Sequence, residues 1–157
     1  MAIEKSYDER YISQIPAIEV LQKLDYEYLR PEVAAQMREN LHDVLLITIL
    51  ENKLKELNSY EYRGEIHKFS ASNIQQAIRD LDEPLTSGLV KTNEAIYETI
   101  MNGRSYTEFL PDGSKKSFTI QYIDWKNFEN NVFHVVEEFE VERMDGRGTV
   151  RPDIVLF

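Results

Sequence analysis

The change of hydrophobic pattern part-way along the chain constrains its fold more than any other feature. Apolar side chains at spacings of three and four predict amphipathic helices over residues 15–25, 32–57, 70–81 and 86–101. Alternating or continuous apolar side chains predict strands over residues 106–110, 118–123, 133–141 and 154–157. Helices that come first and strands that come later predict an α+β fold, in which helices pack on a small mixed β-sheet.

Local signals mark several ends of these elements. Ser13 and Ser72 stand near the starts of the first and third helices, and we expect each to cap its helix. Asn102-Gly103 is typical of a helix C-terminus. Pro111-Asp112-Gly113 predicts a hairpin turn between the first two strands, and residues 58–69 are typical of a loop.

Composition limits the class of protein. The chain has 157 residues, of which 42% are hydrophobic, so we expect one domain over residues 1–157 with a packed core. The absence of cysteine excludes disulfides and thiolate-bound zinc. The N-terminus has no apolar signal segment, and the longest apolar run is too short to cross a bilayer. We therefore expect a soluble cytoplasmic protein without membrane contact.

The charge of the chain bears on its partners. The formal net charge is −10, whereas DNA-binding modules gather positive charge to neutralise phosphates. We therefore expect the isolated chain to bind DNA poorly. Two explanations of the acidity stay open, which are solubility and a nuclease site whose carboxylates hold a metal.

The last predicted strand carries the sharpest local signal. Its continuous apolar run, Ile154–Phe157, predicts a central strand buried on both faces, with an upstream strand, a second copy or further chain as neighbour. Asp153 directly precedes it, behind Pro152, which places a carboxylate at the end of the sheet. Such a carboxylate can bind a hard cation such as Mg²⁺, although a Pro-Asp pair alone is weak evidence.

The surrounding order of residues is much more specific. FTIQYIDW (118–125) is followed by NFENNVFHVV (127–136), EFEVE (138–142), a loop at 146–148 and RPDIVLF (151–157). This order resembles the N-terminal region of R (restriction) subunits of type I restriction-modification enzymes, where "IDF/IDW", "PENNDF.VV.QF.VEG" and "RRPDIVLFVNG" follow one another. The segment SQIPAIEVLQKLDYEYL (13–29) resembles the first helix of that family.

The resemblance implies a nuclease core of the PD-(D/E)xK type. By that match Asp153 is a catalytic residue and the first metal-binding carboxylate, with Mg²⁺ as the cofactor. Glu19 on the first helix would be a further catalytic metal ligand, with Gln14 as a weaker candidate, or else a solvated helix residue. The Glu-x-Lys of the family should lie on a strand after Phe157, so the core is incomplete in this sequence. No P-loop motif occurs either, so ATP would act only in a separate motor region.

Three interpretations of function follow. The first is an N-terminal fragment, inactive by itself, of an R subunit that cleaves double-stranded DNA with Mg²⁺ and ATP-driven translocation, in complex with methylation and specificity subunits. The second is a stand-alone interaction module that docks on a restriction-modification complex. The third is an unrelated α+β domain, against which the ordered run of matches argues. We also expect self-association if the strand at Ile154–Phe157 is left on an edge of the sheet.

Overall fold

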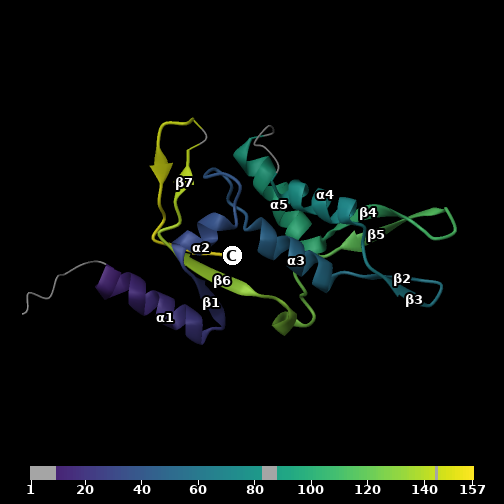
Figure 1. Cartoon of the computed structure of the whole chain (residues 1–157), viewed down its shortest axis with the longest axis horizontal. Coiled ribbons are helices and arrows are strands. Elements are labelled where there is room, and N and C mark those ends of the chain that lie inside the picture. The colour runs from purple at the N-terminus through teal and green to yellow at the C-terminus, as the bar shows by residue number, and fades with distance from the viewer. Residues whose placement is uncertain (1–9, 83–87, 144) are drawn as a thin grey trace, which may run out of the picture. The chain divides into compact units, whose positions relative to one another are not determined.

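A computed structural model describes residues 10–82, 88–143 and 145–157 of the chain (Figure 1). The chain forms two compact units, and each is described by itself. The first unit comprises Met1–Leu46 and Val132–Phe157, and the second comprises Ile47–Asn131. Among the described residues, no helix is long and apolar enough to span a membrane.

The first unit holds helices beside a three-stranded sheet. Its elements in chain order are the π-helix η1 (Arg10–Gln14), α1 (Ile15–Lys23), β1 (Tyr26–Leu29), α2 (Pro31–Gln36), β6 (Phe133–Glu137), β7 (Val141–Glu142), β8 (Thr149–Val150) and β9 (Ile154–Leu156). The strand order is β1-β6-β9, with β1 parallel and β9 antiparallel to β6. A separate two-stranded ribbon is formed by β7 and β8. The predicted α+β fold with a small mixed sheet is therefore confirmed.

The centre of this sheet is β6, not the last strand. Val135 and Val136 of β6 are fully buried, and β6 is hydrogen-bonded to a strand on each side. Among the described residues β9 pairs with β6 alone, and Leu156 remains 49% exposed. The prediction of a central strand at Ile154–Phe157 is thus wrong for the described chain. A continuous apolar run indicates burial, but it does not say which of two apolar strands lies in the middle.

The strand predicted over residues 133–141 is shorter than expected. It ends at Glu137, because Glu138 adopts the left-handed backbone conformation with φ of 52°. A residue in that conformation cannot continue a pleated ladder.

The helical region predicted over residues 32–57 is divided. Helix α2 ends at Gln36, and α3 (Ile47–Leu57) begins after ten intervening residues. Arg38 holds the intervening turn, since its Nη1 donates to the carbonyl oxygens of Asp43 at 3.1 Å and Glu140 at 2.9 Å. These contacts outweigh the helical spacing of the apolar residues in the turn. The N-terminal cap expected at Ser13 is also absent, because η1 runs directly into α1 and Gln14 occupies the cap position.

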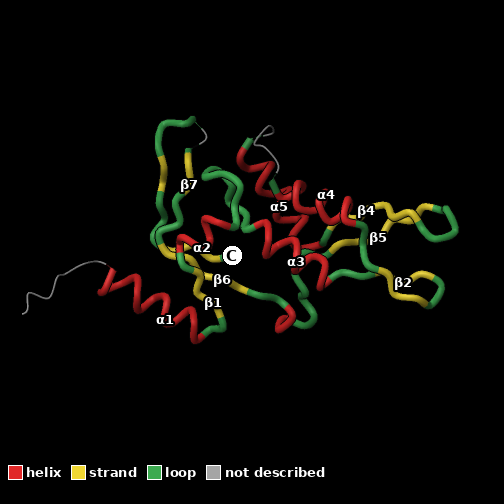
Figure 2. The backbone as a smooth tube through the Cα atoms, in the orientation of Figure 1, coloured by secondary structure: helices red, strands yellow, loops and turns green. Residues whose placement is uncertain are grey.

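The second unit packs three helices against hairpins. Its elements are α3, β2 (Tyr60–Tyr62), β3 (Glu65–His67), α4 (Ala71–Leu81), α5 (Leu89–Asn102), β4 (Arg104–Phe109), β5 (Lys115–Ile120) and the 3-10 helix η2 (Phe128–Asn130). Both hairpins, β2–β3 and β4–β5, are antiparallel, and Figure 2 shows each as two yellow strands joined by a green turn. Leu54, Ile74 and Ile120 are its largest fully buried side chains.

Two local predictions in this unit need correction. The expected loop at 58–69 contains the β2–β3 hairpin, whose turn places Arg63 and Gly64 at φ of 52° and 80°. The cap of α4 is Ser70, whose Oγ accepts from the Asn73 amide at 3.4 Å, and not Ser72. The hairpin turn expected at Pro111-Asp112-Gly113 is confirmed by the pairing of Phe109 with Lys115.

The C-terminus of α5 lies where it was expected. The helix ends at Asn102, and Gly103 follows with φ of 70°. A Cβ atom at Gly103 would stand 2.5 Å from the Ile120 carbonyl oxygen, so the close approach of β5 requires glycine. Residues 86 and 87, where this helix was expected to begin, lie outside the described residues.

Candidate active site at one end of the mixed sheet

One end of the three-stranded sheet carries Asp153, the residue that the sequence singled out most sharply. Because β1 is parallel and β9 antiparallel to β6, the C-terminal ends of β1 and β6 meet the N-terminal end of β9. Glu137 pairs with Ile154, and the Glu138 amide donates to the Asp153 carbonyl oxygen at 3.1 Å. Asp153 therefore lies at this end with an exposed side chain, as its position before the strand predicted.

The conformation of Glu138 is fixed by two side-chain contacts. Gln14 Nε2 donates to Glu138 Oε1 at 3.0 Å, and Arg151 Nε lies 2.7 Å from Glu138 Oε2. Glu138 is left-handed, which is unusual for a residue with a side chain and persists only where contacts hold it. The contacts connect η1, the end of β6 and the segment just before β9. They fix the backbone from which Asp153 projects.

Glu137, the last residue of β6, is a second carboxylate at this end of the sheet. Glu137 is 5% exposed, and its Oε1 accepts a hydrogen bond of 2.7 Å from the Tyr28 hydroxyl on β1. Glu137 also lines a cavity of about 610 Å³. The lining contains both acidic and basic side chains and includes Tyr28, Arg30, Arg38, Glu137, Glu138 and Arg151. Asp153 is not part of this lining, although its neighbour Arg151 is. The cavity combines carboxylates with guanidinium groups, which is suited to polar ligands and not to apolar ones.

Of the two other residues proposed from the sequence as metal ligands, Gln14 is buried and Glu19 is exposed. The Gln14 amide is engaged by Glu138. Glu19 is exposed on α1, directly after the buried Ile18, so its side chain is turned about 100° from the packed face of the helix. No hydrogen bond or ion pair joins Glu19 to Asp153 in the part of the chain that the structure describes.

The donor groups at this end fit a divalent cation in kind but not in number. Carboxylate oxygens are the ligands that Mg²⁺ prefers, and Asp153 presents one carboxylate to solvent. Both carboxylate oxygens of Glu138, however, are engaged by Gln14 and Arg151. Within residues 10–82, 88–143 and 145–157, no group of three or more His, Cys, Asp or Glu side chains could hold a metal ion. The described residues therefore do not form a complete metal site.

His134 on β6 is a buried structural residue. It is 5% exposed, and burial lowers the pKa of its imidazole, while Glu27 on β1 acts in the opposite direction from 3.5 Å. The register of the two strands places Glu27 directly opposite His134.

Comparison with known proteins fits this arrangement. The family model described as "Type I restriction enzyme R protein N terminus" matches residues 6–157. The chain belongs to this family. It is also 29% identical over 156 residues to a protein of Methanocaldococcus jannaschii named as the endonuclease subunit of the type I restriction enzyme MjaIXP. That alignment covers 96% of this chain and 14% of the relative, so the chain spans a small part of the relative's length. No solved structure matches.

Family membership confirms the resemblance stated from the sequence, and the structure adds contacts that the sequence did not reveal. The R protein N-terminal pattern quoted above has Gln where this chain has Glu138. In this chain the Glu138 side chain contacts both Gln14 and Arg151. Gln14 and Glu138 are 124 positions apart in the sequence, and no spacing signal predicted their contact.

Proposed function

We propose that this chain is the N-terminal part of the DNA-cleaving subunit of a type I restriction enzyme, with Asp153 as one ligand of a catalytic Mg²⁺. The observation that supports this most is the exposed carboxylate of Asp153 at the start of β9. The Asp153 carbonyl oxygen accepts a hydrogen bond from the Glu138 amide, and Arg151 forms an ion pair with the Glu138 carboxylate. An exposed carboxylate on a fixed strand end is suited to holding a cation.

Mg²⁺ bound by such a carboxylate would polarise a phosphate oxygen of DNA and lower the pKa of the attacking water. The chain's own part is to hold the Asp153 oxygens in place. A Mg²⁺ ion needs several oxygen ligands, and within the described residues no group of three or more His, Cys, Asp or Glu side chains could hold a metal ion. We therefore propose that these 157 residues do not cleave DNA by themselves.

Glu19 is proposed as a secondary contributor. It lies on α1, whose inner face includes the buried Ile18, but its own side chain is exposed. Water and salt screen the attraction between a cation and an exposed carboxylate such as Glu19. We expect neutralisation of Glu19 to weaken cation binding much less than neutralisation of Asp153.

The partners proposed for the longer protein follow from the family. Double-stranded DNA would be the substrate, and methylation and specificity subunits would complete the enzyme. An ATP-driven motor would lie outside this sequence, which contains no P-loop motif. With a net charge of −10, the chain offers little attraction for DNA, so we propose that DNA affinity comes mainly from those other parts.

Titration calorimetry of the chain with Mg²⁺ and with Mn²⁺ tests the role of Asp153. We expect saturable binding that Asp153→Asn abolishes and Glu19→Gln only weakens. Asp145→Asn is the matched control, because Asp145 is an exposed aspartate in a loop of the same unit. Equal binding by the wild-type chain and Asp153→Asn, or no binding by the wild-type chain, would contradict the proposal.

A further inference from the structure

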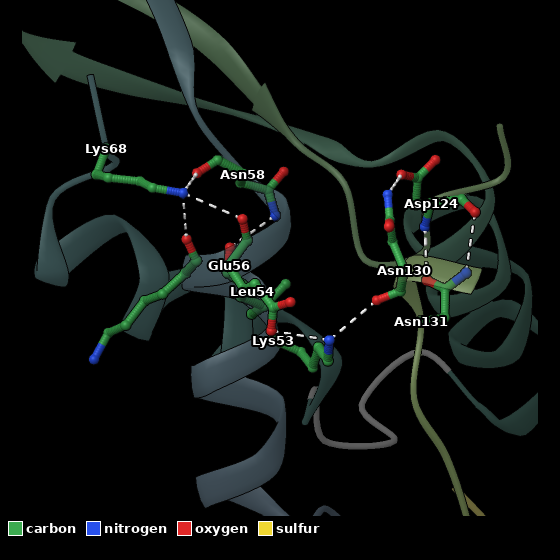
Figure 3. A network of polar contacts seen from close by, with 9 residues as sticks. Lys53, Leu54, Glu56, Asn58, Lys68, Asp124, Asn130 and Asn131 are labelled. Carbon is green, nitrogen blue, oxygen red and sulfur yellow. Dashed lines mark hydrogen bonds and ion pairs between the residues drawn. The ribbon is translucent and has the colours of Figure 1, made fainter. Parts of the chain in front are cut away.

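A loop in the second unit is fixed by its own polar side chains. The Asp124 carboxylate accepts hydrogen bonds from the amides of Lys126 at 3.0 Å and Asn127 at 2.9 Å, and from Asn130 Nδ2 at 2.8 Å. Asn131 Oδ1 accepts from the Asp124 amide at 2.9 Å. The hydrogen bonds from Asn127 and Asn130 lower the pKa of Asp124. Figure 3 shows Asp124, Asn130 and Asn131 turned toward one another in this network.

Further contacts anchor the loop to the rest of the unit. Asn131 Nδ2 donates to the carbonyl oxygens of Asp124 at 3.0 Å and Phe128 at 2.9 Å. Lys53 on α3 donates to the Asn130 carbonyl oxygen at 3.0 Å (Figure 3). These hydrogen bonds fix the backbone of the loop, and the Trp125 side chain on it is 48% exposed. A loop fixed in this way presents Trp125 at little further cost in conformational entropy.

A cavity of about 540 Å³ lies beside Trp125. Leu57, Met101 and Ile123 give it apolar lining. Its polar lining comes from Asn102, Gln121, Asp124, Lys126 and Asn127, and the Asp124 carboxylate is engaged by the hydrogen bonds of the loop. These side chains come from the ends of α3 and α5 and from the residues after β5. The volume is in the range of sites for small ligands or single ring systems.

The lining matches a planar ring with polar edges better than an apolar side chain. An aliphatic or phenyl group would cover Leu57 and Ile123 but would offer no partner to Asn102 and Lys126, which costs free energy. A nucleobase has a π-face that can stack on Trp125 and ring-edge donors and acceptors that can bond amides. Lys126 adds a cation at the same cavity, which suits the adjoining phosphate.

We propose that Trp125 and this cavity bind an unpaired nucleobase of DNA. The inference rests on the proposed function, because it takes DNA as the substrate of the protein. An unpaired base is specified because the faces of paired bases are covered by their neighbours in the duplex. Trp125 is the stacking residue and Asn102 binds the ring edge. Asp124, Asn127, Asn130 and Asn131 are positioning residues.

The single tryptophan of the chain provides a direct readout. A short single strand of thymidylates is titrated into the 157-residue chain without divalent ions, and tryptophan fluorescence is followed. The control strand has the same length and the same phosphates but abasic sugars. We expect saturable quenching by the thymidylate strand and much weaker quenching by the abasic strand. Equal quenching by both strands, or by neither, would overturn the inference.

Variants give a second readout from the anisotropy of a fluorescein-labelled thymidylate strand. Base stacking on an aromatic side chain contributes about 1–3 kcal/mol, so we expect Trp125→Ala to weaken binding about 5- to 150-fold. Phe128→Ala is the matched control, because Phe128 is an exposed aromatic residue of the same loop outside the cavity lining. Equal affinity of Trp125→Ala and the wild-type chain would also overturn the inference, as would quenching by a neutral disaccharide at the same concentration.

The test separates this inference from the metal proposal. The strand titration contains no divalent ion and is repeated with Asp153→Asn, which should bind the thymidylate strand like the wild-type chain. If the wild-type chain binds the thymidylate strand but no metal ion, the proposal for Asp153 fails and the inference about Trp125 stands. If the chain binds the metal ion but does not distinguish the thymidylate strand from the abasic strand, the inference about Trp125 fails and the proposal for Asp153 stands.

Discussion

Removal of the Glu138 side chain should loosen the end of the sheet that carries Asp153. In Glu138→Ala, the buried Gln14 amide loses its acceptor, which costs about 1–3 kcal/mol. The ion pair with Arg151 adds only about 0–1 kcal/mol, because the Arg151 side chain is 63% exposed. The left-handed backbone strain remains in the alanine variant, since alanine also carries a Cβ atom.

Two further substitutions separate these contributions. Glu138→Gln keeps an acceptor for Gln14 and loses only the charge on the ion pair, so we expect a loss of less than about 1 kcal/mol. Glu138→Gly loses both contacts but relieves the left-handed strain, and should be about 1 kcal/mol more stable than Glu138→Ala. The expected order of stability is therefore Gln, then Gly, then Ala.

Hydrogen exchange followed by mass spectrometry measures this loss where it occurs. Peptides from β6 and β9 should exchange faster in Glu138→Ala, by a factor that corresponds to the free energy lost. Peptides from the β4–β5 hairpin belong to the other unit and serve as the internal control. Unchanged exchange in β6 and β9 of the alanine variant, or an alanine variant as protected as the glutamine variant, would refute the reasoning.

Other parts of the chain give three more predictions. Gly103→Ala should lower the free energy of unfolding by about 2 kcal/mol or more, because its Cβ atom meets the Ile120 carbonyl and φ is 70°; urea unfolding followed by tryptophan fluorescence would show it, and an unchanged midpoint would contradict it. Burial lowers the pKa of His134 in the folded state, so stability should fall as pH drops below about 6.5. His134→Gln should flatten that dependence in urea titrations by circular dichroism at several pH values, and an equal slope in both proteins would oppose it. The open edge of β9 should favour self-association, which Leu156→Lys should reduce; a molar mass independent of concentration in light scattering of the wild-type chain would argue against it.

Local patterns in the sequence predicted most helices well but could not set the order of the strands. The apolar spacing of 70–81 and the Asn102-Gly103 signal gave α4 and the end of α5 nearly to the residue. The runs at 133–137 and 154–157 are both apolar, however, and only the pairing with β1 makes β6 central. Strand order is set by contacts between distant segments, which single-sequence periodicity does not contain.

The candidate site was predictable only where local chemistry marked it. Asp153 was singled out because Pro152 and an apolar strand flank it and because the surrounding order resembles the R subunit family. The role of Glu138 was missed, since its left-handed backbone and its contact with Gln14 have no local signal. Helix assignment alone cannot say whether Glu19 faces the sheet, and the structure shows it exposed beside the buried Ile18.

Paramagnetic broadening by Mn²⁺ in two-dimensional ¹H–¹⁵N spectra tests the central claim about Asp153 most directly. A cation held by the Asp153 carboxylate should broaden the amides of Asp153, Ile154 and Glu138 first, because the Glu138 amide is bonded to the Asp153 carbonyl. Asp153→Asn should remove that local broadening, while Asp145→Asn should leave it. Broadening that centres on other carboxylates, or that persists unchanged in Asp153→Asn, would contradict the assignment of Asp153 as the metal-binding carboxylate.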